Sequence, residues 1–212
     1  MPRDFPNSTG SYLSGGDLDV SGSAFSISAW VRMDSYPVDG NGYIVTNGPA
    51  HWALGWFRDI PRFWTGGVAI SSASTASTGV WFHIAGTQVG TGASDKKIYL
   101  NNSVVVTGAG TANGTTGTAV RVGYFGTYGF DGQIAHVGVW DAGLSADEVA
   151  ALYRGVSPGR IRPNSLKGHW PLYGVAYPEP DLSGNGFSLT QTGTVNAYTT
   201  SQPGVGRPRG VS

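Results

Sequence analysis

Residues 130–155 read FDGQIAHVGVWDAGLSADEVAALYRG, a stretch that predicts a strand, a turn, a helix and a stop. From Ile134 to Trp140, apolar residues alternate in a way that places a hydrophobic series on one face of a largely buried strand. Ser145 and Glu148 have the spacing of a capping box, in which each side chain takes a backbone N–H of the first turn. Gly155 supplies a left-handed residue that ends the helix.

This is the only convincing helix in the sequence, and the remainder reads as short strands joined by turns. Residues 25–33, FSISAWVRM, alternate most clearly, with five apolar residues on one face. Residues 51–57, HWALGWF, place three large apolar side chains on one face. Many short strands with one late helix predict a two-sheet antiparallel sandwich, with the helix against one end or edge of a β core.

Composition narrows the classes of protein that the chain can belong to. Its 212 residues are enough for one substantial core and few for two ordinary domains. Only 12% of the residues are charged, and 13 basic residues balance 13 acidic ones, so we expect no nucleic acid partner. There is no cysteine and no apolar run of membrane-spanning length, so we expect neither thiolate metal sites nor membrane insertion.

Three segments carry a resemblance to a known family. The FDG and the following L-S-x-x-E-h-x-x-L-Y-x-G pattern, the strand FSISAWV, and WFHIAGT with its hairpin resemble laminin-G-like, concanavalin A-like lectin and glucanase domains. The resemblance implies an all-β, two-sheet antiparallel jelly-roll sandwich with one short helix. It covers nearly the whole chain.

The order of the motifs predicts the domain organisation. Residues 1–198 are expected to form a single jelly-roll domain. Residues 164–198 contain W-P-L and D-L-S-G-N-G, which resemble the segment that opens the domain in many relatives, so the chain looks circularly permuted. The alternative is that this tail begins a second, incomplete repeat. Residues 199–212, rich in Pro, Gly and Arg, are expected to form an extended arm that docks on a partner.

The fold class includes glucanases, so carboxylate pairs decide whether catalysis is expected. Glycoside hydrolysis generally needs two carboxyl groups that flank the bond. The chain has two glutamates: Glu148, which the capping box explains, and Glu179 between two prolines. No predicted strand carries two carboxylates on one face, and no other catalytic motif is present. The sequence therefore predicts a protein that is not an enzyme, with His83 and His136 as hydrogen-bonded sheet residues.

Calcium is the ion that the resemblance implies, since hard oxygen ligands from Asp, Asn and backbone carbonyls suit it. Asp181 and Asn185 in DLSGNG are the main candidate ligands, and Asp131 in FDG is a further one. An equally good interpretation of DLSGNG is a tight Asx-type turn without an ion.

Sugar binding would use exposed aromatic faces with polar neighbours. The candidate platforms are Trp56, Trp64, Tyr124 and Tyr128, which lie near predicted loops or strand ends. The alternative is that tryptophans in a sandwich of this size mostly fill the core and cover edges.

Two functions from different classes follow. Chains with the W-P-L and P-E-P-D-L-S-G-N-G tail look similar to bacteriophage proteins found on virions, which implies a non-catalytic decoration, fibre or tail component at the virion surface. Its partners would be capsid or tail proteins and further copies of itself, and it could also bind glycans. The alternative is a calcium-dependent carbohydrate-binding lectin module of an extracellular protein.

Overall fold

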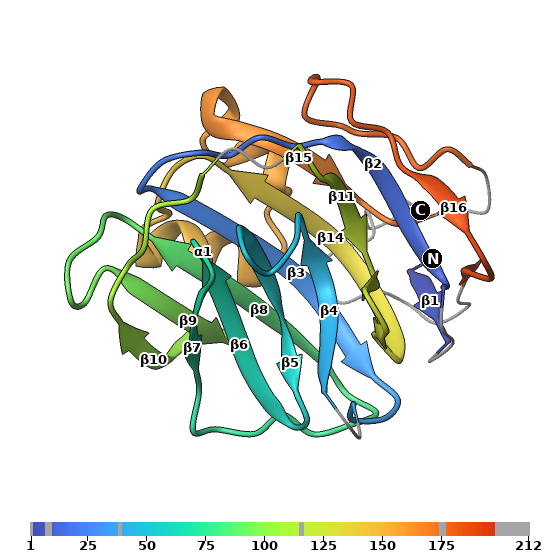
Figure 1. The fold of residues 1–212 in the computed structure, drawn as a ribbon, viewed down its shortest axis with the longest axis horizontal. Coiled ribbons are helices and arrows are strands. Elements are labelled where there is room, and N and C mark those ends of the chain that lie inside the picture. The colour runs from blue at the N-terminus through green and yellow to red at the C-terminus, as the bar shows by residue number, and fades with distance from the viewer. Residues whose placement is uncertain (1, 7–9, 38–39, 115–116, 174–176, 198–212) are drawn as a thin grey trace, which may run out of the picture.

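The computed structural model describes residues 2–6, 10–37, 40–114, 117–173 and 177–197. In these ranges the chain forms two large antiparallel sheets and one α-helix (Figure 1). This is the two-sheet jelly-roll sandwich that the sequence predicted. Within the described ranges, no helix is both long enough and apolar enough to cross a membrane.

The first sheet, sheet A, has eight strands. Its order is β10 (Ser103–Gly108), β9 (Lys96–Leu100), β8 (Trp81–Gln88), β3 (Phe25–Met33), β14 (Gly132–Trp140), β1 (Arg3–Phe5) and β17 (Asn196–Ala197), and β15 (Leu166–Trp170) also pairs with β14.

The second sheet, sheet B, has seven strands. Its order is β16 (Thr190–Thr192), β2 (Tyr12–Asp17), β11 (Ala119–Val122), β4 (Asn41–Thr46), β5 (Trp52–Phe57), β6 (Ile60–Thr65) and β7 (Val68–Ser71). A small hairpin of β12 (Tyr124–Phe125) and β13 (Tyr128–Gly129) follows β11. The helical elements are α1 (Ala146–Tyr153) and two 3-10 turns, η1 (Pro158–Arg160) and η2 (Pro163–Ser165).

The core lies between the two sheets and follows the strand alternation. All five apolar residues of the FSISAWVRM strand that were assigned to one face are buried in it: Phe25, Ile27, Ala29, Val31 and Met33. From sheet B, β5 contributes Trp52, Leu54 and Trp56, as the alternation of HWALGWF predicts.

Strand β14 departs from the alternation that its sequence suggests. Its register with β3 shifts between Ala135 and Gly138, and His136 has a φ of 51°. The bulge inserts one extra residue, so Ile134, Val137 and Val139 all reach the inter-sheet core. The uninterrupted alternation expected from Ile134 to Trp140 was therefore wrong at His136.

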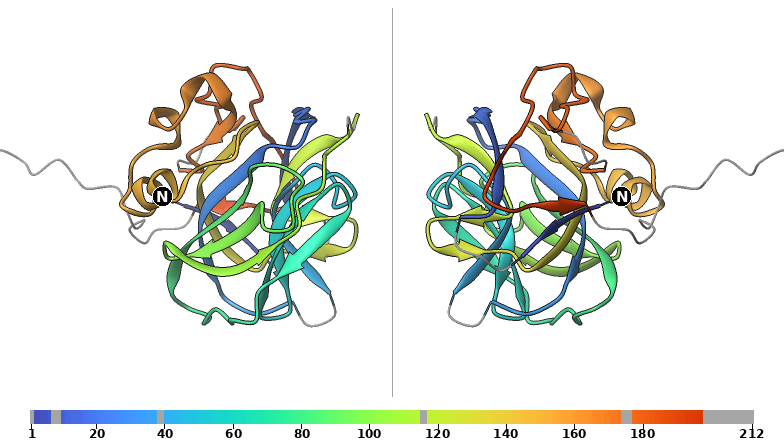
Figure 2. Two further views of the ribbon diagram at one scale, coloured as in Figure 1. Left: turned by 90° about the vertical axis from the view of Figure 1, so that its left-hand side faces the viewer. Right: turned by 90° about the vertical axis from the view of Figure 1, so that its right-hand side faces the viewer.

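Helix α1 has the predicted cap. The Ser145 hydroxyl accepts from the Glu148 backbone N–H, and the Glu148 carboxylate accepts from the Ser145 N–H. Its apolar face, with Val149 and Leu152, packs on the outer face of sheet A in a second core cluster that includes Trp140. The helix therefore lies on the side of the sandwich away from sheet B (Figure 2).

The two ends of the described chain meet at one edge of sheet A. Arg3 in β1 pairs with Ile134 of β14 on one side and with Ala197 of β17 on the other. The Arg3 guanidinium also donates to the Glu179 carboxylate at 3.0 and 2.8 Å, and both side chains are 1% exposed. The C-terminal segment thus adds strands to both sheets. The permuted origin of 164–198 stays a prediction, and the predicted arm 199–212 lies outside the described residues.

The buried ion pair makes a stability prediction. We expect Glu179→Gln and Arg3→Met each to lower the free energy of unfolding by about 3–5 kcal/mol, because each leaves one buried charge without its partner. The double variant Arg3→Met/Glu179→Leu should lose clearly less than the sum, since no buried charge remains. Urea unfolding of the four proteins measures this, and additive losses would contradict the coupling.

Candidate functional site

The outer face of sheet B carries an aromatic cluster separate from the core. In β4, β5 and β6, neighbours in sequence point to opposite faces. Phe63 enters the inter-sheet core, while Trp64 joins Tyr43 and Ala53 in a distinct cluster that also contacts Phe125. The sequence folds this way because each of these strands carries apolar residues on both faces. An aromatic surface therefore remains after the core is filled.

Tyr43 is the centre of this aromatic cluster. Its ring centroid lies 5.5 Å from that of Trp64, 5.9 Å from that of Phe125 and 6.5 Å from that of Tyr128. Tyr128 is 40% exposed, whereas Tyr43 and Trp64 are buried. Burial is also the main reason that the pKa of Tyr43 is raised to about 12, so its hydroxyl stays protonated at neutral pH. Tyr128 and the half-buried Phe125 are therefore the accessible part of the cluster.

The hairpin of β12 and β13 places these rings beside β4. Gly123, just before the hairpin, has a φ of 88°, and a Cβ there would come within 2.2 Å of the Phe5 ring. Only glycine fits this close approach. Tyr124 in the hairpin stacks on Tyr12 of β2, with ring centroids 5.4 Å apart and an interplanar angle of 10°. The aromatic surface thus extends from β6 across to β2.

Two arginines flank the aromatic cluster. The Arg121 guanidinium lies over the Tyr12 ring at 5.1 Å and over the Phe125 ring at 5.6 Å. On the other side, the Arg62 guanidinium lies over the Phe57 ring at 4.3 Å, and its Nε donates to the Ser71 hydroxyl at 2.9 Å. Stacking on a ring holds a guanidinium plane in place, which suits it for recognition of a ligand.

Two buried polar atoms at this face have no hydrogen-bond partner among the described residues: Asn41 Oδ1 and Arg121 Nε. Asn41 lies two residues before Tyr43 on β4, so the two side chains are on the same face of the strand. Buried polar groups are nearly always paired in folded proteins, with protein, water or ligand. These two atoms are therefore candidates for hydrogen bonds to water or to a polar ligand.

Three of the four predicted sugar platforms lie together at this face. Trp64 and Tyr128 both contact Tyr43, and Tyr124 extends the same surface. Trp56 does not belong to it: the alternation of β5 sends it into the core, where it is fully buried against Phe82. Both faces of its ring are covered, so it offers no platform.

Sequence reasoning missed Tyr12, Tyr43, Phe125, Arg62 and Arg121. Alternation was a usable signal for part of this set, since Arg62 and Trp64 are two residues apart on one strand and must share a face. Nothing local could bring β2, β11 and the hairpin beside them.

The predicted calcium ligand Asp181 has its oxygens occupied by the protein. Oδ1 accepts from the backbone N–H groups of His169 and Ser183, each at 2.9 Å. Oδ2 accepts from the Ser183 hydroxyl at 2.7 Å and from the Phe187 N–H at 3.0 Å. Each carboxylate oxygen thus accepts two hydrogen bonds, so its lone pairs are already used and are not open to a cation. Asp181 does not fit a calcium ion here, and the Asx-turn interpretation accounts for its contacts.

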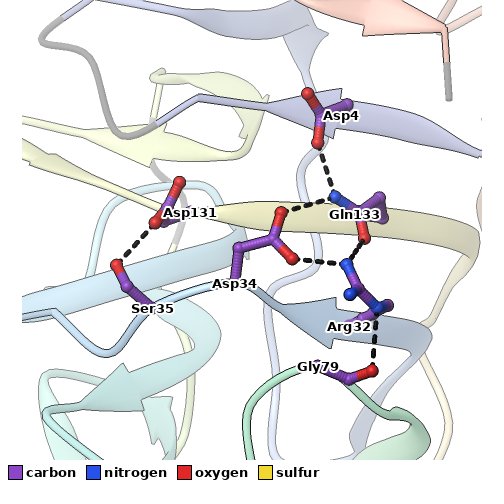
Figure 3. Close-up of polar contacts among 7 residues, drawn as sticks. All are labelled: Asp4, Arg32, Asp34, Ser35, Gly79, Asp131 and Gln133. Carbon is purple, nitrogen blue, oxygen red and sulfur yellow. Dashed lines mark hydrogen bonds and ion pairs between the residues drawn. The ribbon is translucent and has the colours of Figure 1, made fainter.

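The other two predicted calcium ligands also hydrogen-bond the protein, Asn185 through its amide nitrogen and Asp131 through one carboxylate oxygen. The amide nitrogen of Asn185 donates to the Leu166 carbonyl at 2.8 Å, which ties the same turn to β15. Asp131 accepts from the Ser35 hydroxyl at a separate place, beside the network shown in Figure 3. There Gln133 donates to both Asp4 and Asp34 (Figure 3). The described residues contain no group of three or more His, Asp or Glu able to hold a metal ion.

The two glutamates both have structural partners. Glu148 caps α1 and pairs with Arg162 at 2.6 Å, and Glu179 is buried against Arg3. Ser28 and His83 form a further pair, with Oγ and Nε2 2.7 Å apart. Both are buried, and the His83 ring contacts Trp30 and Tyr153. His83 is therefore a buried, hydrogen-bonded residue of β8, as the sequence predicted.

The two antiparallel sheets define a jelly-roll sandwich. The chain belongs to the concanavalin A-like lectin/glucanases superfamily, whose laminin-G-type family model matches residues 7–150. A comparison with curated proteins found no match.

Several solved structures share the fold at low sequence identity. A candidate carbohydrate-binding protein from Bacteroides ovatus superposes with a TM-score of 0.69 and 19% identity; the match covers 94% of this chain and 61% of that protein. Domain 4 of an extracellular arabinanase from Geobacillus stearothermophilus, solved in complex with arabinotriose, gives a TM-score of 0.53 and 17% identity, with coverage of 71% and 75%. A heptameric pentraxin from Limulus polyphemus gives 0.51 and 15%, with coverage of 71% and 80%.

The buried histidines predict a pH dependence of stability. Burial lowers the pKa of His83 from 6.5 to about 3. At pH values between about 3 and 6.5, His83 therefore binds a proton in the unfolded chain but not in the folded chain. Stability must therefore fall as the pH drops below about 6.5, by up to about 1.4 kcal/mol per pH unit for this histidine. Burial also lowers the pKa of His169, to about 4, which adds to the slope.

We expect His83→Gln to make the slope of unfolding free energy against pH shallower between about pH 6.5 and 5, above the range where carboxylates titrate. Urea unfolding at several pH values measures the slope. An unchanged slope in His83→Gln would contradict the assignment.

Proposed function

We propose that the protein is a non-catalytic, lectin-like module that binds glycans through the outer face of sheet B. The observation that carries this proposal is the aromatic cluster around Tyr43, with Tyr128 and Phe125 accessible and two arginines beside it. The C–H face of a pyranose stacks on aromatic rings, while its hydroxyls need precisely aimed polar groups. This face offers both.

The residues of the face take distinct roles. Tyr128 and Phe125 supply the stacking surface, and the buried Tyr43 and Trp64 hold their position from below. Asn41 Oδ1 and Arg121 Nε, which lack partners among the described residues, supply an acceptor and a donor for sugar hydroxyls. Because no calcium ligand set fits at Asp181, we expect binding to survive a chelator.

A glycan array on the full chain tests the proposal, run with calcium and with a chelator. We expect Tyr128→Ala to weaken binding by roughly thirtyfold, the effect of losing a central aromatic contact of about 2 kcal/mol. Tyr173→Ala is the matched control, because Tyr173 is 51% exposed and packs beside His136 instead. Equal losses in both variants, or a blank array, would reject the proposed face.

A second candidate function is a structural component of a virion surface, and a free sheet edge supports it. Strand β10 is at the end of sheet A, and no charged residue occurs between Asn101 and Val120. The neighbouring edge strand of sheet B, β7, is also uncharged. Val104 in β10 is 50% exposed and Val68 in β7 is 49% exposed. Free edges usually carry Lys or Pro that block pairing with another chain.

We propose that two copies pair along β10 in an antiparallel, two-fold arrangement. The two copies present the same surface to each other, and because β10 carries no charged residue the pairing involves no repulsion between like charges. Such a dimer would support a role as a repeated structural unit, which further contacts would have to join into a coat. The full chain should then show a concentration-dependent mass in analytical ultracentrifugation. Val104→Lys should yield single chains, whereas Leu182→Lys, at a 51% exposed leucine in the DLSGNG turn, should not. A single-chain mass of the unmodified protein at all concentrations would contradict the pairing.

A further inference from the structure

We infer that the outer face of sheet B selects acidic sugars, that is, pyranoses that carry a carboxylate or another anionic group. The inference rests on the proposed glycan binding and adds the chemical class of the ligand. It comes from the charges of the face rather than from its aromatic rings.

Within the described part of the chain, Arg62 and Arg121 form no ion pair with an acidic residue. Among the described residues, carboxylates form ion pairs with Arg3, Arg32, Arg162 and Lys167. Arg62 and Arg121 take part in none of these pairs. Arg58, Arg154 and Arg160 are likewise in none of them, so what distinguishes Arg62 and Arg121 is their position among the aromatic rings.

The strands of sheet B lack the carboxylates that could neutralise these arginines. Asp17, the last residue of β2, is the one acidic residue within their bounds, and its side chain accepts from the Asn47 amide at 3.0 Å. A bound anion on the strands of this face therefore meets positive charge, while Asp59 lies just outside the strand bounds, in the turn between β5 and β6.

Both guanidinium groups are oriented before any ligand binds. Arg121 lies between the Tyr12 and Phe125 rings, and Arg62 is fixed by Phe57 and by the Ser71 hydroxyl. Stacking uses the faces of a guanidinium and leaves donors along its edge, which match the two oxygens of a carboxylate. For Arg121 one such donor, Nε, is buried without a partner among the described residues.

The sheet register sets the size of the ligand. Arg121 pairs with Thr46, Thr46 with Ala53, and Ala53 with Trp64, so Arg121 and Trp64 lie on one row of the sheet. Three strand spacings separate them, roughly 14 Å. The side chains of Thr46 and Ala53 lie between them and are fully buried, so they offer no contact to a ligand. A short oligosaccharide spans this distance, with a ring at the aromatic cluster and an anionic group at an arginine.

The experiment compares sugars that differ only in the charged group. The full chain is titrated with sialylated oligosaccharides and their desialylated forms, with uronic acid oligomers and their carboxyl-reduced forms, and with sulfated counterparts. We expect the acidic member to bind about tenfold more tightly or better, the effect of one charge-assisted contact. The sulfated arm separates recognition of a carboxylate from recognition of any anion.

Variants assign the preference to the arginines. Arg62→Gln should bring the affinity for the acidic sugar down toward that for its neutral form, with the affinity for neutral sugars little changed. Arg121→Gln should weaken binding of the acidic sugar more than binding of the neutral one, and should weaken both, because Arg121 Nε is also the proposed donor for sugar hydroxyls. Arg121→Lys should retain only part of the preference for acidic sugars, because an ammonium group lacks the planar set of N–H donors that matches the two oxygens of a carboxylate. Arg160→Gln, at an exposed arginine in η1, is the matched control. Thermal unfolding of each variant excludes misfolding.

The outcomes separate the inference from the proposed function. Equal affinity for neutral and acidic sugars would overturn the acidic preference and leave glycan binding in place. Absence of binding to every sugar would overturn both. A single-stranded oligonucleotide is included because arginines among aromatic rings also suit nucleic acids, and tighter binding to it than to any acidic sugar would overturn the inference.

Discussion

The hydrogen bonding of β14 is the constraint on which the rest of the structure depends. This strand pairs with β3 along one edge, and along the other it pairs first with β1 and then with β15. The bulge at His136 lies between the part of β14 that pairs with β1 and the part that pairs with β15. Because of the bulge, apolar residues on both sides of it still point into the inter-sheet core. The helix that follows then covers the outer face of the same sheet.

The candidate site arises from an excess of apolar residues over what the core needs. Sheet A buries part of its outer face under α1, whereas the described segment beside the outer face of sheet B is the two-stranded hairpin of β12 and β13. Aromatic residues at outward positions of β4 and β6 therefore pack on each other and on arginine side chains. This packing of aromatic rings and arginines provides an apolar surface and orients positive charge. These are the two properties that recognition of an acidic sugar would need.

Local patterns predicted the strands around residues 25–33 and 51–57, the cap of α1 and the sandwich class, because alternation and capping depend on neighbours in the sequence. The bulge at His136 was missed because the apolar residues around it fit either register. The pair between Arg3 and Glu179 joins residues 176 positions apart, and no local signal links them. Only part of the candidate site could be predicted. Trp64 and Tyr128 are aromatic, and this alone made them candidates for stacking on a sugar. Arg121 became a candidate only once the fold had placed it over the rings of Tyr12 and Phe125, which are on other strands.

The side-by-side position of β1 and β17 has a mechanical consequence. Arg3 faces Ala197 across an antiparallel pair, so the chain enters and leaves the sandwich at the same point of one sheet edge. A force applied between the two ends would act across this ladder and open its hydrogen bonds one after another instead of shearing them together. The load would reach the buried ion pair of Arg3 early, while the outer face of sheet B, on the other sheet, would carry little of it.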